Sequence, residues 1–339
     1  MRIVAGRYKG KNLISPKGED VRPTTTRIKE TLFNILQCDV PSARVLDLFA
    51  GSGSLGIECI SRGAEHVTFV DKSRDSIALI RENLKGIDGQ YSVINSDFMA
   101  ALNGAAYNGI KYDLIFLDPP YASGLAELAI DKIFEFDLLS QYGIIVFEHG
   151  SEKTYTLAAD GYKQRTKRMG TVTAEFITRK HIALMTGSFD PFTRGHEAVL
   201  DEALCRFDEV VVACLINEDK KYTFTNAQRL ALVEAVCSIK KGARAVFSDK
   251  FAVEVAKEVV ACVLVRGIRD NDDVEYENEM AKYNKEHGYD TVFIQPDFYG
   301  EISSTKVKEQ LKSGDFSSIP PITVALMSSE EYQKRLCGA

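Results

Sequence analysis

Short apolar runs alternate with longer amphipathic segments through the first half of the chain. One of the longer segments, residues 124–139, carries its apolar residues at helical spacing. The apolar runs predict strands at residues 44–49, 66–71, 91–95, 112–117, 143–148 and 171–178. Alternation of strands and helices is typical of a mostly parallel sheet that is covered on both faces. The first half is therefore predicted to be an α/β domain with a doubly wound sheet.

A second domain is predicted to begin at residue 181. Residues 181–187 form another strand-like run, and an amphipathic segment follows at residues 197–207. At 339 residues the chain exceeds the size at which a single core keeps growing. Gly, Pro and Ser do not mark the junction, so motif content sets the boundary. We expect two doubly wound α/β domains with Rossmann-like folds, at residues 1–180 and 181–339.

The composition fits a globular protein with two cores, because 45% of the residues are hydrophobic and 27% are charged. The longest apolar run near the middle, residues 210–216, is too short to cross a membrane, and the N-terminus does not resemble a signal peptide. We therefore expect a cytoplasmic protein without a membrane partner. The seven cysteines include no C-x-x-C pair, so we expect reduced thiols and no metal site.

Charge is distributed unevenly between the two halves. Residues 1–180 carry 23 basic and 22 acidic side chains, whereas residues 181–339 carry 19 and 26. The first 29 residues contain eight basic side chains and two acidic ones, and residues 163–168 contain a second basic cluster. Such a run is either a solvated face or a surface for a phosphate backbone, and the sequence leaves both interpretations open.

A glycine-rich turn follows the first predicted strand and opens a helix. Its sequence, at residues 51–56, is Gly-Ser-Gly-Ser-Leu-Gly. Glycines in such a turn let the main chain approach a ligand closely. Asp71 ends the second strand, where a carboxylate would accept hydrogen bonds from both hydroxyls of a ribose. This spacing fits a dinucleotide-binding fold and a methyltransferase fold equally well.

Further strand ends favour a methyltransferase. Asp47 precedes the glycines, Asp97 ends the third strand in a position to meet an adenine amine, and Asp118 begins the sequence Asp-Pro-Pro-Tyr after the fourth strand. An exocyclic amine is a poor nucleophile because its lone pair is delocalised into the ring, so a site must orient the amine and accept its hydrogens. Asp118 and the carbonyl of Pro119 are suitable acceptors, and Tyr121 offers a stacking surface for an extruded base.

These motifs resemble the S-adenosylmethionine-dependent methyltransferases that act on exocyclic amines of bases. Residues 6–11 and 21–34 extend the resemblance to the bacterial enzymes that methylate N2 of a guanine in 16S rRNA, over residues 1 to about 180. Thr26 stands where that family commonly carries Asp. A DNA adenine-N6 methyltransferase remains the enzymatic alternative, because it shares Asp-Pro-Pro-Tyr.

The resemblance implies S-adenosylmethionine as cofactor and 16S rRNA, or the small ribosomal subunit particle, as partner. The implied catalytic residues are Asp118, Pro119 and Tyr121. The implied cofactor-binding residues are Asp47, Gly51, Gly53, Asp71 and Asp97. The implied RNA-binding residues lie mainly in the basic N-terminal arm and are Arg7, Lys9, Lys11, Arg22 and Arg27.

The second half contains an ordered set of motifs of another kind. His196 stands at the start of a predicted helix, where free amides and the helix dipole favour phosphate. The sequence around it, Thr-x-Gly-His, is followed by motifs at residues 220–225, 265–277 and 302–308. Together they resemble phosphopantetheine adenylyltransferase, over residues 182–328. Nicotinamide mononucleotide adenylyltransferases share the first and last motifs, but the arginine and acidic residues at 265–277 argue against that subfamily.

This resemblance implies transfer of AMP from ATP to 4'-phosphopantetheine, with Mg²⁺ accompanying the triphosphate, and a hexameric assembly. His196 would stabilise the transition state. The implied phosphopantetheine-binding residues are Ser188, Lys220, Phe251 and Arg266. The implied ATP-binding residues are Ser188, Phe189, His196, Gly267, Ile268, Arg269, Glu277, Tyr299, Ser303, Ser304 and Thr305.

The sequence thus predicts a bifunctional enzyme. The competing interpretation is that one half has lost its activity and serves as an RNA-binding or assembly module. The complete set of acids in the first half, and His196, Lys220 and Arg266 in the second, argue against such a loss.

Overall fold

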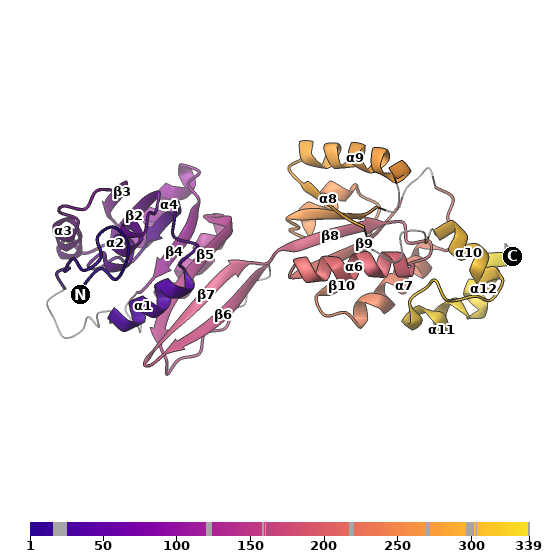
Figure 1. Ribbon diagram of the computed structural model, residues 1–339, viewed down its shortest axis with the longest axis horizontal. Coiled ribbons are helices and arrows are strands. Elements are labelled where there is room, and N and C mark those ends of the chain that lie inside the picture. Colours follow the sequence, from indigo (N-terminus) through magenta and orange to yellow (C-terminus); the bar gives the residue numbers. More distant parts are fainter. Residues whose placement is uncertain are drawn as a thin grey trace. The chain divides into compact units, whose positions relative to one another are not determined.

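A computed structural model describes residues 1–15, 26–119, 124–157, 159, 161–216, 220–268, 271–295, 302 and 304–337. The chain divides into two compact units, Met1–Arg179 and Lys180–Ala339. Each unit is built around its own sheet (Figure 1). Among the described residues, no helix is long and apolar enough to cross a membrane.

The first unit is a seven-stranded sheet between two layers of helices. Its strands are β1 (Arg44–Asp47), β2 (His66–Asp71), β3 (Tyr91–Asn95), β4 (Tyr112–Leu117), β5 (Leu139–Gly150), β6 (Tyr162–Met169) and β7 (Val172–Arg179). They are ordered β3-β2-β1-β4-β5-β7-β6, and only the pairs that involve β7 are antiparallel. The helices are α1 (Thr26–Ile35), α2 (Ser54–Ser61), α3 (Arg74–Asn83), α4 (Phe98–Tyr107) and α5 (Leu125–Glu135).

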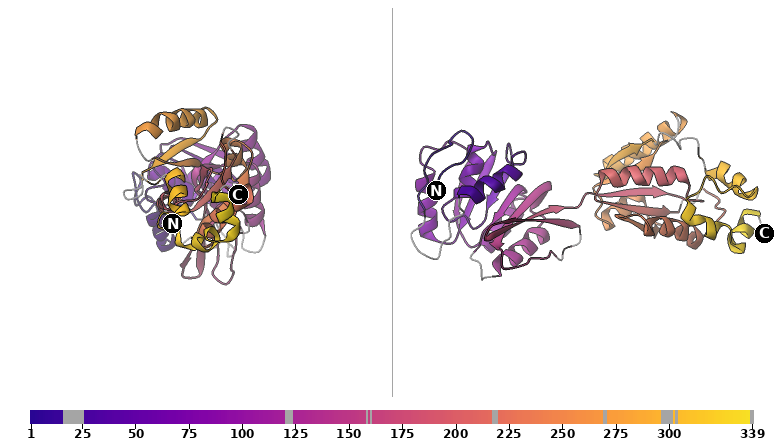
Figure 2. Two further views of the ribbon diagram at one scale, coloured as in Figure 1. Left: turned by 90° about the vertical axis from the view of Figure 1, so that its right-hand side faces the viewer. Right: turned by 60° about the horizontal axis from the view of Figure 1, so that its bottom comes forward.

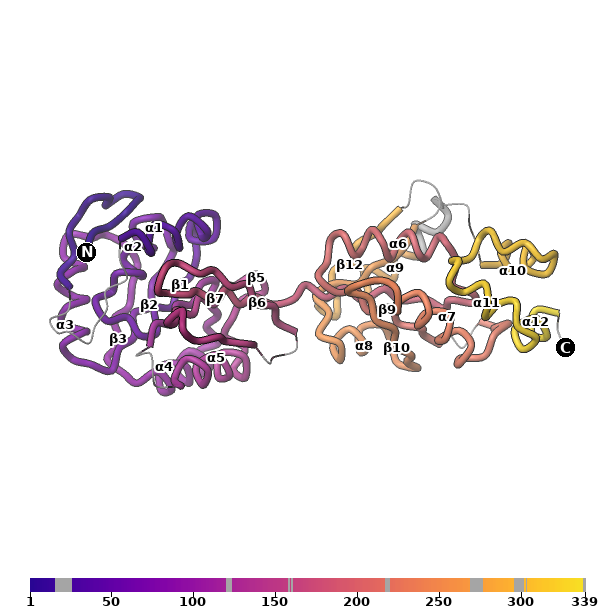
Figure 3. Tube along the Cα trace, turned by 90° about the horizontal axis from the view of Figure 1, so that it is seen from below, coloured from indigo at the N-terminus to yellow at the C-terminus, as the bar shows by residue number. Residues whose placement is uncertain are grey.

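Two apolar cores cover the two faces of this sheet. Residues of α1, α2 and α3, such as Phe33 and Ile57, pack on one face, and residues of α4 and α5, such as Leu102 and Ile130, pack on the other. Figure 3 shows α1 and α2 on one side of the sheet and α4 and α5 on the other. Alternate residues of a strand point to opposite faces, so Val45 belongs to the first core and Leu46 to the second.

The second unit has a five-stranded, fully parallel sheet. Its strands are β8 (Ile182–Gly187), β9 (Glu209–Leu215), β10 (Ala243–Ser248), β11 (Val263–Gly267) and β12 (Asp290–Ile294), in the order β10-β9-β8-β11-β12. Its helices are α6 (Arg194–Arg206), α7 (Asn226–Ser238), α8 (Ala252–Glu258), α9 (Asn271–Glu286), α10 (Ser304–Lys312), α11 (Val324–Met327) and α12 (Glu330–Cys337), with a 3-10 turn at Pro321–Thr323. Helices α6 and α7 contribute to the core on one face, and α8 contributes to the core on the other (Figure 2).

The predicted fold class, two doubly wound α/β domains, is confirmed, and two local predictions need correction. The helix expected at 124–139 ends at Glu135, and β5 begins at Leu139, before the strand expected at 143–148. The second basic cluster is part of an edge strand, β6, that the apolar pattern does not reveal. Edge strands are often rich in charged residues because one side of their backbone faces solvent.

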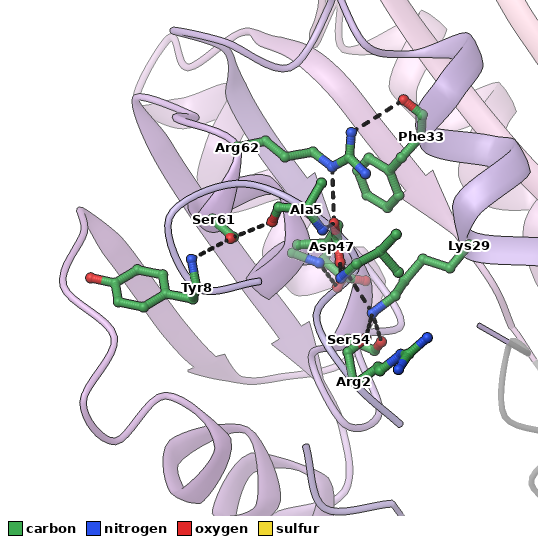
Figure 4. Close-up of polar contacts among 12 residues, drawn as sticks. Arg2, Ala5, Tyr8, Lys29, Phe33, Asp47, Ser54, Ser61 and Arg62 are labelled. Carbon is green, nitrogen blue, oxygen red and sulfur yellow. Dashed lines mark hydrogen bonds and ion pairs between the residues drawn. The ribbon is translucent and has the colours of Figure 1, made fainter. Parts of the chain in front are cut away.

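A buried glutamate joins the N-terminal arm to the first unit. The carboxylate of Glu58, on α2, accepts hydrogen bonds from the backbone amides of Val4 (2.8 Å) and Ala5 (2.9 Å). It also pairs with Lys29 of α1 (3.3 Å) and Arg62 (2.9 Å). Figure 4 shows the surrounding contacts, including those of Lys29 with Arg2 and Ser54. The arm is thus a packed part of this unit.

Lys29 therefore differs from the sequence-based interpretation of the basic arm. It is only 1% exposed, and its ammonium group donates to the Arg2 carbonyl at 2.7 Å. Burial lowers the pKa of Lys29, and the adjacent Glu58 carboxylate opposes that shift. This lysine holds α1 and the arm together and does not face a ligand.

Replacing Glu58 tests this anchoring role. Glu58→Ala removes the acceptor for two amides and leaves Lys29 buried without its carboxylate, so we expect the first unit to lose about 3–5 kcal/mol of stability. Native-state hydrogen exchange of the β1 and α2 amides measures this loss without interference from the second unit. The exposed Glu65→Ala is the control and should change the stability by about 0.5 kcal/mol or less. Equal exchange rates in both variants would show that Glu58 does not anchor the arm.

Candidate active sites

The glycine-rich turn of the first unit is held by Asp71, at the end of β2. One oxygen of the Asp71 carboxylate accepts the Gly51 amide (2.9 Å), and the other accepts the Ser73 amide (2.8 Å). Gly51 and Gly53 have positive φ angles of 53° and 75°, which other residues rarely adopt. The turn therefore depends on both glycines and on Asp71, and each carboxylate oxygen keeps a second lone pair for a ligand.

Asp47 lies beneath the same turn, at the end of β1, and is 3% exposed. Its carboxylate accepts the Gly56 amide of α2 at 3.0 Å. Burial raises the pKa of Asp47 to about 7, the charges of Asp118 and Asp71 add to the shift, and the hydrogen bond from Gly56 opposes it. Asp47 thus supports the start of α2 from inside the sheet.

Asp97, expected to meet an adenine amine, is an exposed helix cap. One of its carboxylate oxygens accepts the Ala100 amide at 3.0 Å, which satisfies an unpaired donor in the first turn of α4. Because β3 is the edge strand next to β2, Asp97 and Asp71 lie at the same edge of the sheet. The structure therefore leaves the second Asp97 oxygen as the acceptor that a ligand would use.

Asp118 and Pro119 follow directly after β4. Asp118 is half-buried, and no hydrogen bond to its carboxylate forms within the described segments. Burial raises the pKa of Asp118 to about 6. Tyr121 lies outside the described residues. A partly desolvated carboxylate at a strand end has the character of a proton acceptor for a group that enters the site.

A fifth acid, Glu148 of β5, was missed as a site residue by sequence reasoning. It is 3% exposed, and burial raises its pKa well above the ordinary value, with further contributions from the charges of Asp118 and Asp47. The available signal was its position, because it is the last residue of the apolar run at 143–148 and thus a charge at the carboxyl end of a buried strand.

The basic residues of the arm are mostly exposed. Arg7 pairs with Asp88 at 3.3 Å, and Lys11 donates to the Lys85 carbonyl. Lys9 and Arg27 are also exposed. Arg22 lies outside the described residues. The structure thus exposes three of the five predicted RNA-binding residues, Arg7, Lys9 and Arg27, and half-buries Lys11.

The basic cluster on β6 shares a sheet face with the acids. Lys167 pairs with Ala174, which pairs with Glu148 across β7. Paired residues of neighbouring strands project to the same face of a sheet, so Lys163, Arg165 and Lys167 share the face of Glu148. Arg168 belongs to the opposite face.

In the second unit, His196 is fixed by a helix cap. The Thr193 amide donates to Nδ1 of His196 at 3.0 Å, and the Thr193 hydroxyl accepts the His196 amide at 3.3 Å. Since Nδ1 accepts a hydrogen bond from the Thr193 amide, the neutral ring carries its own proton on Nε2. The ring packs against Phe189 and Phe192, with centroids 5.1 and 5.4 Å away. The structure therefore presents His196 as a donor through Nε2.

An ion pair joins the first motif to the last one. Asp190 accepts the amides of Thr223 and Phe224 and pairs with Lys308 of α10 at 2.5 Å. Ser304, at the start of α10, lies within 3.5 Å of the Pro191 carbonyl. The N-terminus of α10 is therefore held against the loop that follows β8, where His196 also lies.

Arg266 and Glu277, assigned to different ligands by the sequence, bind each other. The guanidinium forms a bidentate pair with the Glu277 carboxylate, at 2.7 and 2.6 Å, and donates to the carbonyl and hydroxyl of Thr186. Such a pair fixes the plane of the arginine. The structure thus shows Glu277 as the partner that orients Arg266.

The remaining predicted residues vary in their placement. Gly267 is the last residue of β11, where a Cβ atom would lie 2.8 Å from Val199, so a side chain would not fit. Phe189 buries its ring, which leaves only its main chain for a ligand. Ser188 and Ile268 are half-buried, whereas Lys220, Thr305 and Phe251, 70% exposed, lie on the surface. Arg269, Tyr299 and Ser303 lie outside the described residues.

Arg229 of α7 is a buried residue that sequence reasoning did not single out. Its guanidinium donates to the carbonyls of Ser188 and Leu215, and it stacks on Tyr222 at 3.9 Å. These contacts tie the loops after β8 and β9 together. The sequence offered little signal, because an arginine in an amphipathic helix is usually solvated.

Comparisons with known proteins match the two halves of the chain separately. The family model described as Conserved hypothetical protein 95 matches residues 1–178, and the one described as Cytidylyltransferase-like matches residues 184–310. Ribosomal RNA small subunit methyltransferase D of Escherichia coli (strain K12) is 34% identical over 182 residues, which cover 53% of this chain and 90% of that protein. Phosphopantetheine adenylyltransferase of Shouchella clausii (strain KSM-K16) is 40% identical over 157 residues, which cover 45% of this chain and 98% of that protein.

A solved structure, a putative methyltransferase from Escherichia coli, is 30% identical and has a TM-score of 0.47, with 53% of this chain and 97% of that chain covered. The protein is a transferase that joins two doubly wound domains. It belongs to the Conserved hypothetical protein 95 family through its first half and to the phosphopantetheine adenylyltransferases through its second.

The raised pKa of Asp118 predicts a stabilising substitution. Because the folded-state pKa lies above the ordinary value, folding favours the protonated acid, and the first unit loses stability as the pH rises from about 4 to about 6. Asp118→Asn removes that cost, so we expect a gain of about 1–3 kcal/mol at pH 8 that disappears at pH 4.

Scanning calorimetry of the full chain measures this gain. The unfolding transition of the first unit is identified as the one whose midpoint falls in Glu58→Ala. The exposed Asp75→Asn is the matched control and should leave the transition unchanged at both pH values. A loss of stability in Asp118→Asn at pH 8 would contradict the inferred cost of ionising this carboxyl.

Proposed function

We propose that the chain is a bifunctional transferase with one activity in each half. Residues 1–180 transfer a methyl group from S-adenosylmethionine to the N2 amine of a guanine in 16S rRNA. Residues 181–339 transfer AMP from ATP to 4'-phosphopantetheine, which gives dephospho-CoA and pyrophosphate. The observation that carries the first assignment is the half-buried Asp118 at the end of β4, beside the Pro119 carbonyl and on one sheet edge with Asp47 and Asp71.

The acids of the first unit divide the work of methyl transfer. Bound S-adenosylmethionine supplies an electrophilic methyl group. Asp71 and the Gly51 turn would hold its ribose, and Asp97 would accept from its adenine amine. Asp118 and the Pro119 carbonyl would accept the two hydrogens of the guanine amine, which aims the nitrogen lone pair at the methyl group. After transfer, the amine carries an extra proton, and the Asp118 carboxylate takes it.

The adenylyl transfer proceeds without a covalent intermediate on the enzyme. An oxygen of the 4'-phosphate attacks the α-phosphorus of ATP, and pyrophosphate leaves. Negative charge grows on the non-bridging oxygens, where the Nε2 proton of His196 would donate a hydrogen bond. Arg266, oriented by Glu277, and Lys220 would hold phosphopantetheine, while Gly267, Ile268, Ser304 and Thr305 would contact ATP. We propose that Mg²⁺ accompanies the triphosphate.

The surface that would meet RNA is basic and belongs to the first unit. Lys9 and Arg27 are exposed, and Lys163, Arg165 and Lys167 of β6 share a sheet face with Glu148. Phosphate contacts from such side chains position a nucleic acid but carry no sequence information. Base choice therefore has to come from the strand-end acids. The hexamer expected for the second half stays a prediction, and solution mass measurement tests it.

Two single substitutions test whether both halves are active. Asp118→Asn should lower methyl transfer at least about 100-fold and leave dephospho-CoA formation unchanged. His196→Ala should lower dephospho-CoA formation by about 100- to 1,000-fold and leave methyl transfer unchanged. The assays are incorporation of labelled methyl groups into 16S rRNA within small-subunit particles and direct measurement of dephospho-CoA.

The exposed His287→Ala is the control for the histidine substitution and should affect neither assay. Absence of one activity from the wild-type protein under these conditions would favour a single enzyme with an attached binding module. Preferential methylation of DNA adenine would favour the adenine-N6 alternative.

Charge removal in the arm tests the RNA surface. Deleting the arm would remove the buried Ile3 and the two amides that donate to Glu58, so point substitutions are the cleaner test. If Lys9 and Arg27 each contact a phosphate, the double variant Lys9→Ala/Arg27→Ala should bind 16S rRNA more weakly, and the slope of log affinity against log salt should fall by about one per contact. Binding across a range of KCl concentrations measures the slope. The exposed Lys334→Ala of α12 removes one positive charge from the second unit, and a slope change per charge equal to that of the double variant would refute the proposed surface.

A further inference from the structure

Glu148 is a buried acid that the proposed methyl transfer does not yet use. It is 3% exposed, and its Oε1 atom has no hydrogen-bond partner within the described part of the chain. Buried polar atoms in native proteins nearly always have a partner, so an exception calls for a physical explanation. A ligand that supplies the missing hydrogen bond is one such explanation.

The position of Glu148 places it beside Asp118. Asp47 pairs with Phe116 of β4, and Phe116 pairs with Val146 of β5. The last pair between these two strands is Leu117 with Phe147, so Asp118 and Glu148 come next on neighbouring strands. Neighbouring strands lie about 4.8 Å apart. Asp118 and Glu148 therefore stand next to each other at the carboxyl edge of the sheet.

A pocket opens at this edge. It is lined by Glu148 and Pro119, with Phe147 and Tyr155 forming an aromatic wall in which the two rings meet edge to face at 5.2 Å. The first turn of α5 completes it. Because Phe147 and Glu148 are consecutive residues of β5, the Phe147 and Tyr155 rings approach the carboxyl edge from the α5 face of the sheet and the Glu148 carboxylate approaches it from the other face.

The N1–N2 edge of guanine presents three hydrogens, one on N1 and two on the amine. Asp118 and the Pro119 carbonyl account for the two amine hydrogens. We propose that Glu148 accepts the remaining one, the N1 hydrogen, and so selects guanine as the methyl acceptor. This inference rests on the proposed guanine-N2 methylation. Adenine has an acceptor at N1, so an ionised Glu148 would face a lone pair and reject it.

The unpaired state of Glu148 in the protein without RNA fits this role. Burial and the charges of Asp118 and Asp47 disfavour its ionised form, and a hydrogen-bond donor favours it. When guanine enters, its N1 hydrogen is that donor, and the carboxyl proton of Glu148 leaves to solvent. Adenine has no N1 hydrogen and cannot stabilise the ionised carboxylate, so adenine would bind only while Glu148 keeps its proton and donates it to N1.

A substrate with a methyl group on N1 isolates this contact. We compare methyl transfer to guanosine and to 1-methylguanosine at the target position of 16S rRNA, with wild-type protein and with Glu148→Leu. Wild type should lose at least about tenfold in kcat/KM on 1-methylguanosine, because the accepted hydrogen is gone. Glu148→Leu should lose a similar factor on guanosine and show no further loss on 1-methylguanosine.

The controls separate base recognition from damage to the site. Glu152→Leu changes an exposed glutamate four residues away and should behave like wild type on both substrates. Cofactor affinity, measured by calorimetric titration, should be unchanged in Glu148→Leu. If that variant does not fold, Glu148→Met, which is apolar and of similar length, takes its place.

Two failures are distinguishable in this experiment. An equal penalty for 1-methylguanosine in wild type and in the Glu148 variant would show that no contact between Glu148 and N1 exists, while guanine methylation itself stands. If wild-type protein does not methylate guanine in RNA, the proposed function fails first. A tenfold or greater penalty in wild type that vanishes in the variant establishes the contact.

Discussion

A carboxylate at the end of a buried parallel strand has apolar neighbours on its sheet side and main-chain amides of the next loop on the other. The number of main-chain amides that donate hydrogen bonds to the carboxylate then determines how well its charge is stabilised. Asp71 receives two and Asp47 receives one, whereas Asp118 and Glu148 receive none within the described segments. The acids along this edge of the sheet therefore differ in role. Asp71 supports the turn through two hydrogen bonds, whereas Asp118 and Glu148 are acceptors that remain unsatisfied within the described segments. The chemistry proposed for the first unit depends on these unsatisfied acceptors.

In the second unit, by contrast, two cationic side chains are paired with carboxylates. Arg266 is held by Glu277, and Lys308 by Asp190, so each of these two cations has a carboxylate partner in the same unit. Pairing fixes the direction of a side chain and lowers the cost of burying it. This arrangement suits a reaction in which positioning supplies most of the acceleration, as in attack of one phosphate on another. Both units thus use the same edge of the same kind of sheet, with a different balance between unsatisfied and paired groups.

The sequence was sufficient for the fold class and for the strand-end positions, because hydrophobic period and glycine turns are local properties. The sequence was insufficient for side-chain contacts that form only through tertiary packing. The sequence placed Lys29 in a basic run, but the structure buries it against Glu58. The sequence assigned Arg266 and Glu277 to different ligands, but in the structure they pair with each other. β6 carries no apolar pattern because only its neighbour β7 shields it. Glu148 stood at a visible strand end, but only cross-strand register reveals that it adjoins Asp118.

Asn83 of α3 connects the arm to the glycine-rich turn. Its side-chain amide bonds both main-chain groups of Ile14 and also donates to the Ser52 carbonyl at 3.0 Å. A displacement of Ile14 must therefore move Ser52 or break a hydrogen bond in a buried place. Thermodynamic linkage makes any such effect reciprocal, so a cofactor that tightens the turn would also tighten the arm. If the first unit binds S-adenosylmethionine as proposed, the bound methyl donor would thereby also steady the segment that carries the basic residues.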